Sequence, residues 1–220
     1  MAPAGYRPHL PATSLFLDIG QGAGLAGASG IRPFLPPLLA GALARGDIGI
    51  DFSGTTWDFL ESPGFLLAIF ALAVIWYGAE RSGANRMLEL AAASIGLALG
   101  ALLFAGSLAA GGGEAWPGIF AGVACGALAW AAVGGLLDRT RARLAAQERG
   151  SGANGRAESG REGPSGSFLT AYAEIAALLL AALAVFLPPV SFLALAAFVF
   201  LLVRSRQERE RKYAGLRVLR

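Results

Sequence analysis

Arg32 is the ionisable residue whose setting most clearly indicates chemistry. It lies inside a long, glycine-rich apolar stretch, residues 15–44, and Pro33 follows it directly. Proline disfavours helical geometry at the residue before it and removes a backbone donor. A helix that is broken beside a charge at membrane depth is typical of transporters, where the freed backbone groups line a cavity. We therefore expect a substrate-binding or gating site around the break, with the candidate residues Gly24, Gly27, Gly30, Arg32, Pro33 and Pro36. The alternative is an interfacial or structurally paired arginine.

Glu174 is the candidate partner of Arg32, because it is the one charge in the apolar stretch 168–187. It lies about 9 Å into that stretch at a helical rise of about 1.5 Å per residue, where an unpaired carboxylate costs a few kcal/mol. If the first span covers residues 24–44, Arg32 lies about 12 Å from the inner face and can pair with Glu174. If that span covers residues 14–32, Arg32 reaches the outer interface and residues 34–44 are re-entrant or interfacial. Both placements stay open.

The scarcity of reactive residues argues against an enzyme. The chain has one histidine, His9, one cysteine, Cys125, and one lysine, Lys212. A histidine-based triad, a zinc site and a phosphate-binding P-loop therefore lack their residues. Glycines at positions 22, 24 and 27 match the dinucleotide fingerprint, but prolines follow them where that fold needs a helix on a parallel sheet. We expect no enzymatic activity, no metal and no cofactor.

The composition indicates that these residues meet a lipid bilayer. Hydrophobic residues make up 55% of the chain and charged residues 15%, against about 45–50% and about 25% in soluble domains. Five apolar stretches follow the first: residues 65–79, 90–110, 115–137, 168–187 and 190–203. A backbone inside a bilayer must satisfy its own hydrogen bonds, so these stretches are expected to be helices. We predict an all-α, polytopic membrane protein with about six transmembrane helices and a broken or re-entrant first segment.

The polar segments predict the domain limits and the orientation. We expect four spans in residues 1–137, a flexible cytoplasmic linker at 138–167, a two-span hairpin at 168–203 and a basic cytoplasmic tail at 204–220. The linker holds six arginines and the tail seven basic residues, so the positive-inside rule places both in the cytoplasm. With six spans, both termini are then cytoplasmic. Anionic lipid headgroups are the expected partners of the tail, and nucleic acid is not.

Small residues recur at a spacing of four in the third and fourth apolar stretches. Residues four apart share one face of a helix, and glycine on that face lets two backbones approach closely. The residues concerned are Gly96 and Gly100, then Gly118, Gly122 and Gly126. We expect helix packing through them. A functional alternative is that these faces let helices slide, and in a scaffold they would dock partner proteins. A homo-oligomer is a further expected form of the protein.

Two segments carry a family resemblance. The run from Gly27 to Arg45, which contains Ile-Arg-Pro-Phe-Leu-Pro-Pro, and the Phe-Leu-Glu-Ser-Pro at residues 59–63 resemble a family of bacterial multi-pass inner-membrane proteins known only as a domain of unknown function. The resemblance implies the bacterial cytoplasmic membrane and supplies no activity. From the residues themselves we expect a small transporter or channel-like permease of unknown solute, with a non-transporting scaffold or assembly factor as the alternative.

Overall fold

The protein is a bundle of helices. The computed structural model describes residues 12–83, 86–150 and 164–216, and within these ranges every regular element is helical. The elements are α1 (Ala12–Ile31), α2 (Leu35–Arg45), the short 3-10 helix η1 (Asp58–Glu61), α3 (Pro63–Gly83), α4 (Arg86–Ala110), α5 (Trp116–Gly150), α6 (Pro164–Phe186) and α7 (Pro188–Leu216). The predicted all-α class is confirmed.

Four of these helices, α3, α4, α5 and α7, are long and apolar enough to cross a membrane, and α6 contributes a shorter apolar helix, Ala171–Phe186. Their large apolar side chains project outward, as Leu67, Phe120 and Leu193 do with about 70% of their surface exposed. Exposure on this scale would be unfavourable in water and is expected where lipid is the solvent. The chain is therefore a membrane protein.

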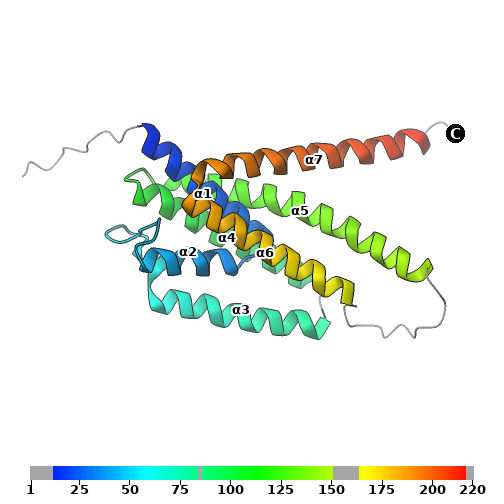
Figure 1. Ribbon diagram of the computed structural model, residues 1–220, viewed down its shortest axis with the longest axis horizontal. Coiled ribbons are helices and arrows are strands. Elements are labelled where there is room, and N and C mark those ends of the chain that lie inside the picture. Colours follow the sequence, from blue (N-terminus) through cyan, green and yellow to red (C-terminus); the bar gives the residue numbers. More distant parts are fainter. Residues whose placement is uncertain (1–11, 84–85, 151–163, 217–220) are drawn as a thin grey trace, which may run out of the picture.

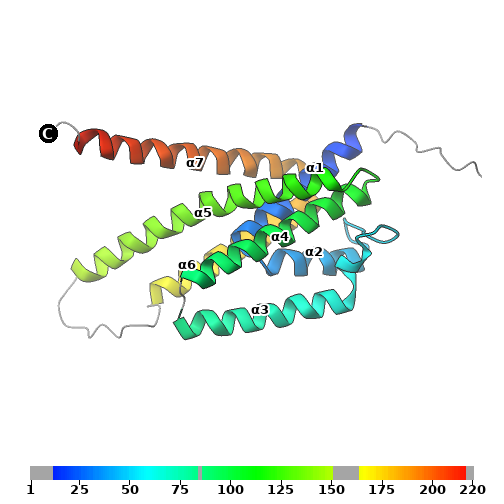
Figure 2. The same ribbon diagram turned by 180° about the vertical axis from the view of Figure 1, so that it is seen from behind.

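Helix α1 forms the centre of the bundle. It packs against α4 and α5 on one side and against α6 and α7 on the other (Figures 1 and 2). Every residue from 20 to 30 is buried. Because other helices enclose it, α1 does not need an apolar outer surface, which explains how it can be rich in glycine and still lie inside a membrane protein.

The first apolar stretch is broken, as predicted, and the chain turns back at the break. Helix α1 ends at Ile31, α2 begins at Leu35, and α2 runs back toward the end of the bundle where α1 starts (Figure 1). The return is fixed by the Gln21 side-chain amide, which donates to the Gly49 carbonyl oxygen at 2.9 Å just beyond α2. Residues 15–44 thus form a helical hairpin, and Arg32 lies at its turn.

The bundle has two distinct ends. At the first, the loop end, the start of α1 lies beside the α4–α5 turn and the α6–α7 turn: the rings of Phe16 and Phe192 stack at 4.6 Å, and Gly20 abuts the Pro188 carbonyl group. At the second, the basic end, α3, α5 and α7 finish and α4 and α6 begin (Figure 1). The described chain therefore starts at one end of the bundle and finishes at the other.

This arrangement bears on two parts of the predicted topology. The expectation that both termini share one face depends on residues 15–44 making a single pass. The turn at Arg32 and Pro33 folds that stretch into two antiparallel helices, so α1 begins at the loop end and α7 finishes at the basic end. Within the predicted linker, residues 138–167, α5 continues as helix to Gly150 and α6 begins at Pro164. The rest of it, residues 151–163, lies outside the described residues.

Candidate functional site

The turn of the hairpin is a three-residue break held at both sides. The Arg32 amide still donates to the Ala28 carbonyl at 3.0 Å, which completes the last turn of α1. Pro33 has no amide hydrogen to continue the ladder. Phe34 then anchors the break in the bundle, because its ring is 1% exposed and lies 5.9 Å from the ring of Trp76 on α3.

Arg32 forms an ion pair with Glu80 near the end of α3. The guanidinium Nη1 lies 3.7 Å from the Glu80 Oε1, and the two side chains are 14% and 30% exposed. The same Oε1 accepts a hydrogen bond from the indole nitrogen of Trp76 at 3.2 Å. Glu80 is therefore positioned by a hydrogen bond from its own helix and by an ion pair with the hairpin turn.

Glu174 reaches the same place from α6. Its carboxylate is hydrogen-bonded to the Tyr77 side chain, and the charges of Arg32, Glu80 and Glu174 all lie close enough to act on the Tyr77 hydroxyl. We call Arg32, Tyr77, Glu80 and Glu174 the polar cluster. It brings together one positive and two negative groups from the hairpin turn, α3 and α6. Arg32 and Glu174 thus act on the same tyrosine hydroxyl, and the ion pair of Arg32 is with Glu80, a residue that the sequence analysis did not name as a candidate.

The polar cluster combines a guanidinium with two carboxylates and a phenol hydroxyl. A guanidinium offers five donors in a planar fork, a geometry that fits a carboxylate or a phosphate. Within the described residues, no group of three or more His, Cys, Asp or Glu side chains is placed to hold a metal ion.

The glycines predicted to line the site lie instead at helix crossings. A methyl group on Gly24 would collide with Ser191 and Ala184, and one on Gly30 would collide with the backbone of Gly126. Gly27 has looser surroundings, because a methyl group there would lie 3.6 Å from the Phe198 ring, its nearest neighbour. Pro33 and Pro36 are buried in the hairpin. These residues shape the hairpin and its packing, while Arg32 and Glu174 are the charged members of the predicted set.

The small residues spaced by four pack helices together, and α1 takes part in that packing. A methyl group on Gly96 would lie 2.5 Å from the Ser29 carbonyl oxygen, and one on Gly100 would lie 3.1 Å from that of Ala26. On α5, a methyl group on Gly118 would lie 2.8 Å from the Ala105 Cα, and one on Gly122 would lie 2.7 Å from the Ala101 Cα. Gly126 lies against Leu97. These faces are occupied by the chain's own helices.

A second feature, absent from the sequence expectations, closes the loop end. Ile50, Phe52 and Leu60, which we call the loop plug, are at most 5% exposed although they belong to the connection between α2 and α3. The Phe52 ring and Leu60 fill the space above Gly106, where a methyl group would lie 2.9 Å from each. The Phe52 amide donates to the Glu61 carboxylate at 3.3 Å. The connection is thus a packed lid over the interior of the bundle.

The polar rim of this lid is held by local hydrogen bonds. The Ser53 hydroxyl and amide both donate to the Asp51 carboxylate, the amide at 2.8 Å, and they hold the pKa of Asp51 below its usual value. Gly49 has a positive φ of 73°, a conformation that a side chain would strain. The apolar Ile50 and Phe52 on either side of Asp51 were the signal in the sequence that could have revealed the plug.

Comparison with known proteins places the chain in a family without supplying an activity. A search of the curated proteins and a search of the solved structures gave no match. The family model described as "Domain of unknown function (DUF4126)" matches residues 19–208, which include the hairpin, the polar cluster and all seven described α-helices in whole or in part. The resemblance seen at residues 27–45 and 59–63 is confirmed. The chain therefore belongs to the DUF4126 family of domains of unknown function.

Proposed function

We propose that the protein is a small permease or channel-like membrane protein, and not an enzyme, in which the polar cluster contacts an anionic solute or gates its passage. The observation that supports this most is the ion pair of Arg32 and Glu80 at the turn of a broken helix inside an otherwise apolar bundle. Buried ion pairs add little to stability because desolvating the charges is costly. Charges beside a helix break at membrane depth are, by contrast, the arrangement of transporter sites.

Two features would serve as the barriers that such a protein needs. The loop plug is buried at the loop end, and the ion pair of the polar cluster ties α3 to the hairpin toward the basic end. Helix α3 packs on α2 and η1 and lies at the edge of the bundle (Figure 2). We infer that parting Glu80 from Arg32 frees the end of α3, and that this movement opens a path to the hairpin turn while α1 stays in place.

The alternative, a scaffold that docks partners through its glycine faces, has less support. Gly96, Gly100, Gly118, Gly122 and Gly126 all pack against other helices of the same chain. A partner could use them only by displacing α1 or α4. The glycines with open surroundings, such as Gly64 and Gly78 on α3, do not form such a face.

We also propose that the protein lies in the bacterial cytoplasmic membrane with its basic end toward the cytoplasm. The argument is the positive-inside rule, since the arginine-rich final parts of α5 and α7 lie at this end. The start of α1 then faces outward. Arg206 near the end of the apolar part of α7 is exposed, and we expect this region to contact anionic headgroups.

Flux from reconstituted vesicles tests the proposal. Purified protein would be inserted into liposomes loaded with chloride, phosphate or acetate, and release would be followed for the wild type, Arg32→Ala, Glu80→Gln and the control Arg45→Ala, whose side chain is exposed at the loop end. We expect Glu80→Gln to raise the release of at least one anion, Arg32→Ala to abolish the wild-type release, and Arg45→Ala to match the wild type. No release by either the wild type or Glu80→Gln, with correctly inserted protein, would overturn transport and favour the scaffold.

A further inference from the structure

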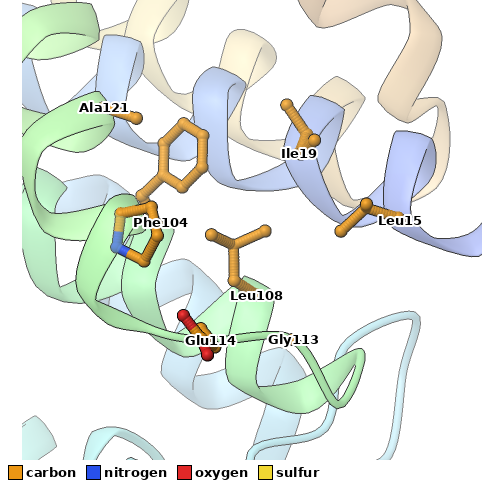
Figure 3. A pocket seen from close by; sticks show the side chains of 8 residues that line it. Leu15, Ile19, Phe104, Leu108, Gly113, Glu114 and Ala121 are labelled. Atoms are coloured by element: carbon orange, nitrogen blue, oxygen red, sulfur yellow. The ribbon is translucent and has the colours of Figure 1, made fainter.

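A groove of about 320 Å³ opens between α1, α4 and α5 at the loop end. Two side chains from each helix line it, namely Leu15, Ile19, Phe104, Leu108, Pro117 and Ala121 (Figure 3). This volume is at the lower end of the range of roughly 300–1,000 Å³ for small-molecule sites. The groove is suited to a thin hydrocarbon chain, because every one of these six side chains is apolar.

The surroundings of the groove indicate that it opens toward lipid. On α1 and α5, the residue beside a groove-lining residue is exposed. Phe16, next to Leu15, has 50% of its surface exposed, and Phe120, next to Ala121, has 70% exposed. Helices α4 and α5 are both long and apolar enough to cross the membrane. The groove is therefore continuous with the surface that faces lipid, and an acyl chain is the molecule that this environment supplies.

The polar edge of the groove selects a headgroup. Glu114, in the α4–α5 turn, also lines the groove and accepts a hydrogen bond at 2.8 Å from the indole nitrogen of Trp116. The Trp116 side chain is 61% exposed. A carboxylate beside an exposed indole attracts an ammonium group through its charge and through cation–π contact. The Asp18 carboxyl group lies nearby, against Gly111 of the same turn.

We propose that this groove is a binding site for a phospholipid with an amine headgroup, of the phosphatidylethanolamine class. One acyl chain lies between α1, α4 and α5, and the ammonium group lies at Glu114 and Trp116. The loop end then prefers a zwitterionic lipid, whereas the basic end attracts anionic ones. This site is separate from the polar cluster, so the inference does not depend on transport.

Native mass spectrometry of the detergent-solubilised protein with added lipid tests the inference. Phosphatidylethanolamine and phosphatidylglycerol with identical acyl chains would be compared on the wild type, Glu114→Gln, Ala121→Phe and Ala124→Phe. Ala121→Phe fills the groove, and Ala124→Phe adds the same ring to an exposed position of α5 outside it. The surface variant Glu114→Gln keeps the test informative if Ala121→Phe fails to fold.

The expected result has two parts. Ala121→Phe weakens phosphatidylethanolamine binding about tenfold, which corresponds to about 1.4 kcal/mol, while Ala124→Phe leaves it unchanged. Glu114→Gln removes the preference for phosphatidylethanolamine over phosphatidylglycerol while chain binding persists. Equal binding of the two lipids to the wild type would overturn the headgroup assignment, and phosphatidylethanolamine binding that survives Ala121→Phe unaltered would overturn the groove itself.

Discussion

Arg32 and Glu80 connect the turn of the α1–α2 hairpin to the end of α3 across 3.7 Å, and Trp76 donates to the same carboxylate oxygen. The pair joins the central helical hairpin to the helix at the edge of the bundle. It also brings a full positive and a full negative charge into a place where most neighbours are apolar, as the adjacent packing of Phe34 and Trp76 shows. Two properties of the Arg32–Glu80 pair can be measured: its contribution to the stability of the protein, and whether breaking it exposes the hairpin turn.

Neutralising either Arg32 or Glu80 should lower the free energy of unfolding. Neutralising both should lower it by less than the sum of the two single changes. Arg32→Gln leaves Glu80 with Trp76 as its donor, and Glu80→Gln leaves the guanidinium with a weaker acceptor. We expect a coupling energy of about 0.5–3 kcal/mol in a double-mutant cycle, measured by unfolding in detergent. Additive effects of Arg32→Gln and Glu80→Gln would show that the two side chains do not interact.

Gly30 and Gly78 form a matched pair of helical glycines with opposite surroundings. Gly30→Ala would drive a methyl group into the backbone of Gly126, whereas nothing lies within 4 Å of the corresponding position at Gly78. We expect Gly30→Ala to destabilise by about 1–3 kcal/mol through overpacking and Gly78→Ala to stabilise by up to about 1 kcal/mol through helix propensity. Thermal unfolding of both variants in one detergent tests this, and a Gly30→Ala protein as stable as the wild type would refute the α1–α5 crossing.

Phe52 should contribute far more to stability than Phe59, although both belong to the same connection. The Phe52 side chain is fully buried in the loop plug, and that of Phe59 is 39% exposed. Removing a buried phenylalanine side chain costs about 3–5 kcal/mol, so Phe52→Ala should lower the unfolding temperature strongly and Phe59→Ala should lower it little. Limited proteolysis near residues 46–57 offers a second readout, since loss of the plug should expose this segment. Equal losses in the two variants would contradict the lid.

The orientation can be tested by thiol labelling, because Cys125 is the sole cysteine and Cys125→Ala gives a cysteine-free chain. Ser53 is exposed at the loop end. Gln207 is exposed where the apolar part of α7 ends. In intact cells, an impermeant maleimide should label Ser53→Cys, and it should label Gln207→Cys only after the membrane is permeabilised. The reverse pattern would invert the proposed orientation, and labelling of both in intact cells would show that the two ends are not on opposite faces.

Much of this fold follows from the sequence because a bilayer imposes simple rules. Apolar length predicted the helices α3 to α7, and Arg32-Pro33 predicted the break. The direction of α1 did not follow, because its path depends on which helices enclose it, and a buried glycine-rich helix gives hydropathy little to detect. The sequence left open whether residues 15–44 span once or are re-entrant, because the antiparallel path of α1 and α2 appears only in the folded chain.

The polar cluster was predictable only in part. Arg32 and Glu174 stood out because each interrupts an apolar stretch. Glu80 lies at the end of its apolar stretch, beside Arg81, where an acidic residue usually meets water, so the sequence did not single it out. Its spacing of four from Trp76 is the signal that the two can interact on one helix face. The pairing with Arg32 needs the hairpin turn, which only the folded chain provides.

The most direct test of the gate is the accessibility of a thiol behind it. Ile31 precedes the break and packs on the core formed by Leu25, Ala28 and their neighbours. In the Cys125→Ala background, Ile31→Cys would be exposed to an impermeant methanethiosulfonate from the cytoplasmic side, with and without Glu80→Gln, and Gln207→Cys would serve as the control for reagent access. We predict that Glu80→Gln speeds the modification of Ile31→Cys about tenfold or more, a shift of about 1.4 kcal/mol toward the open form, and leaves Gln207→Cys unchanged. An identical rate at Ile31→Cys with and without Glu80→Gln would contradict a gate at the Arg32–Glu80 pair.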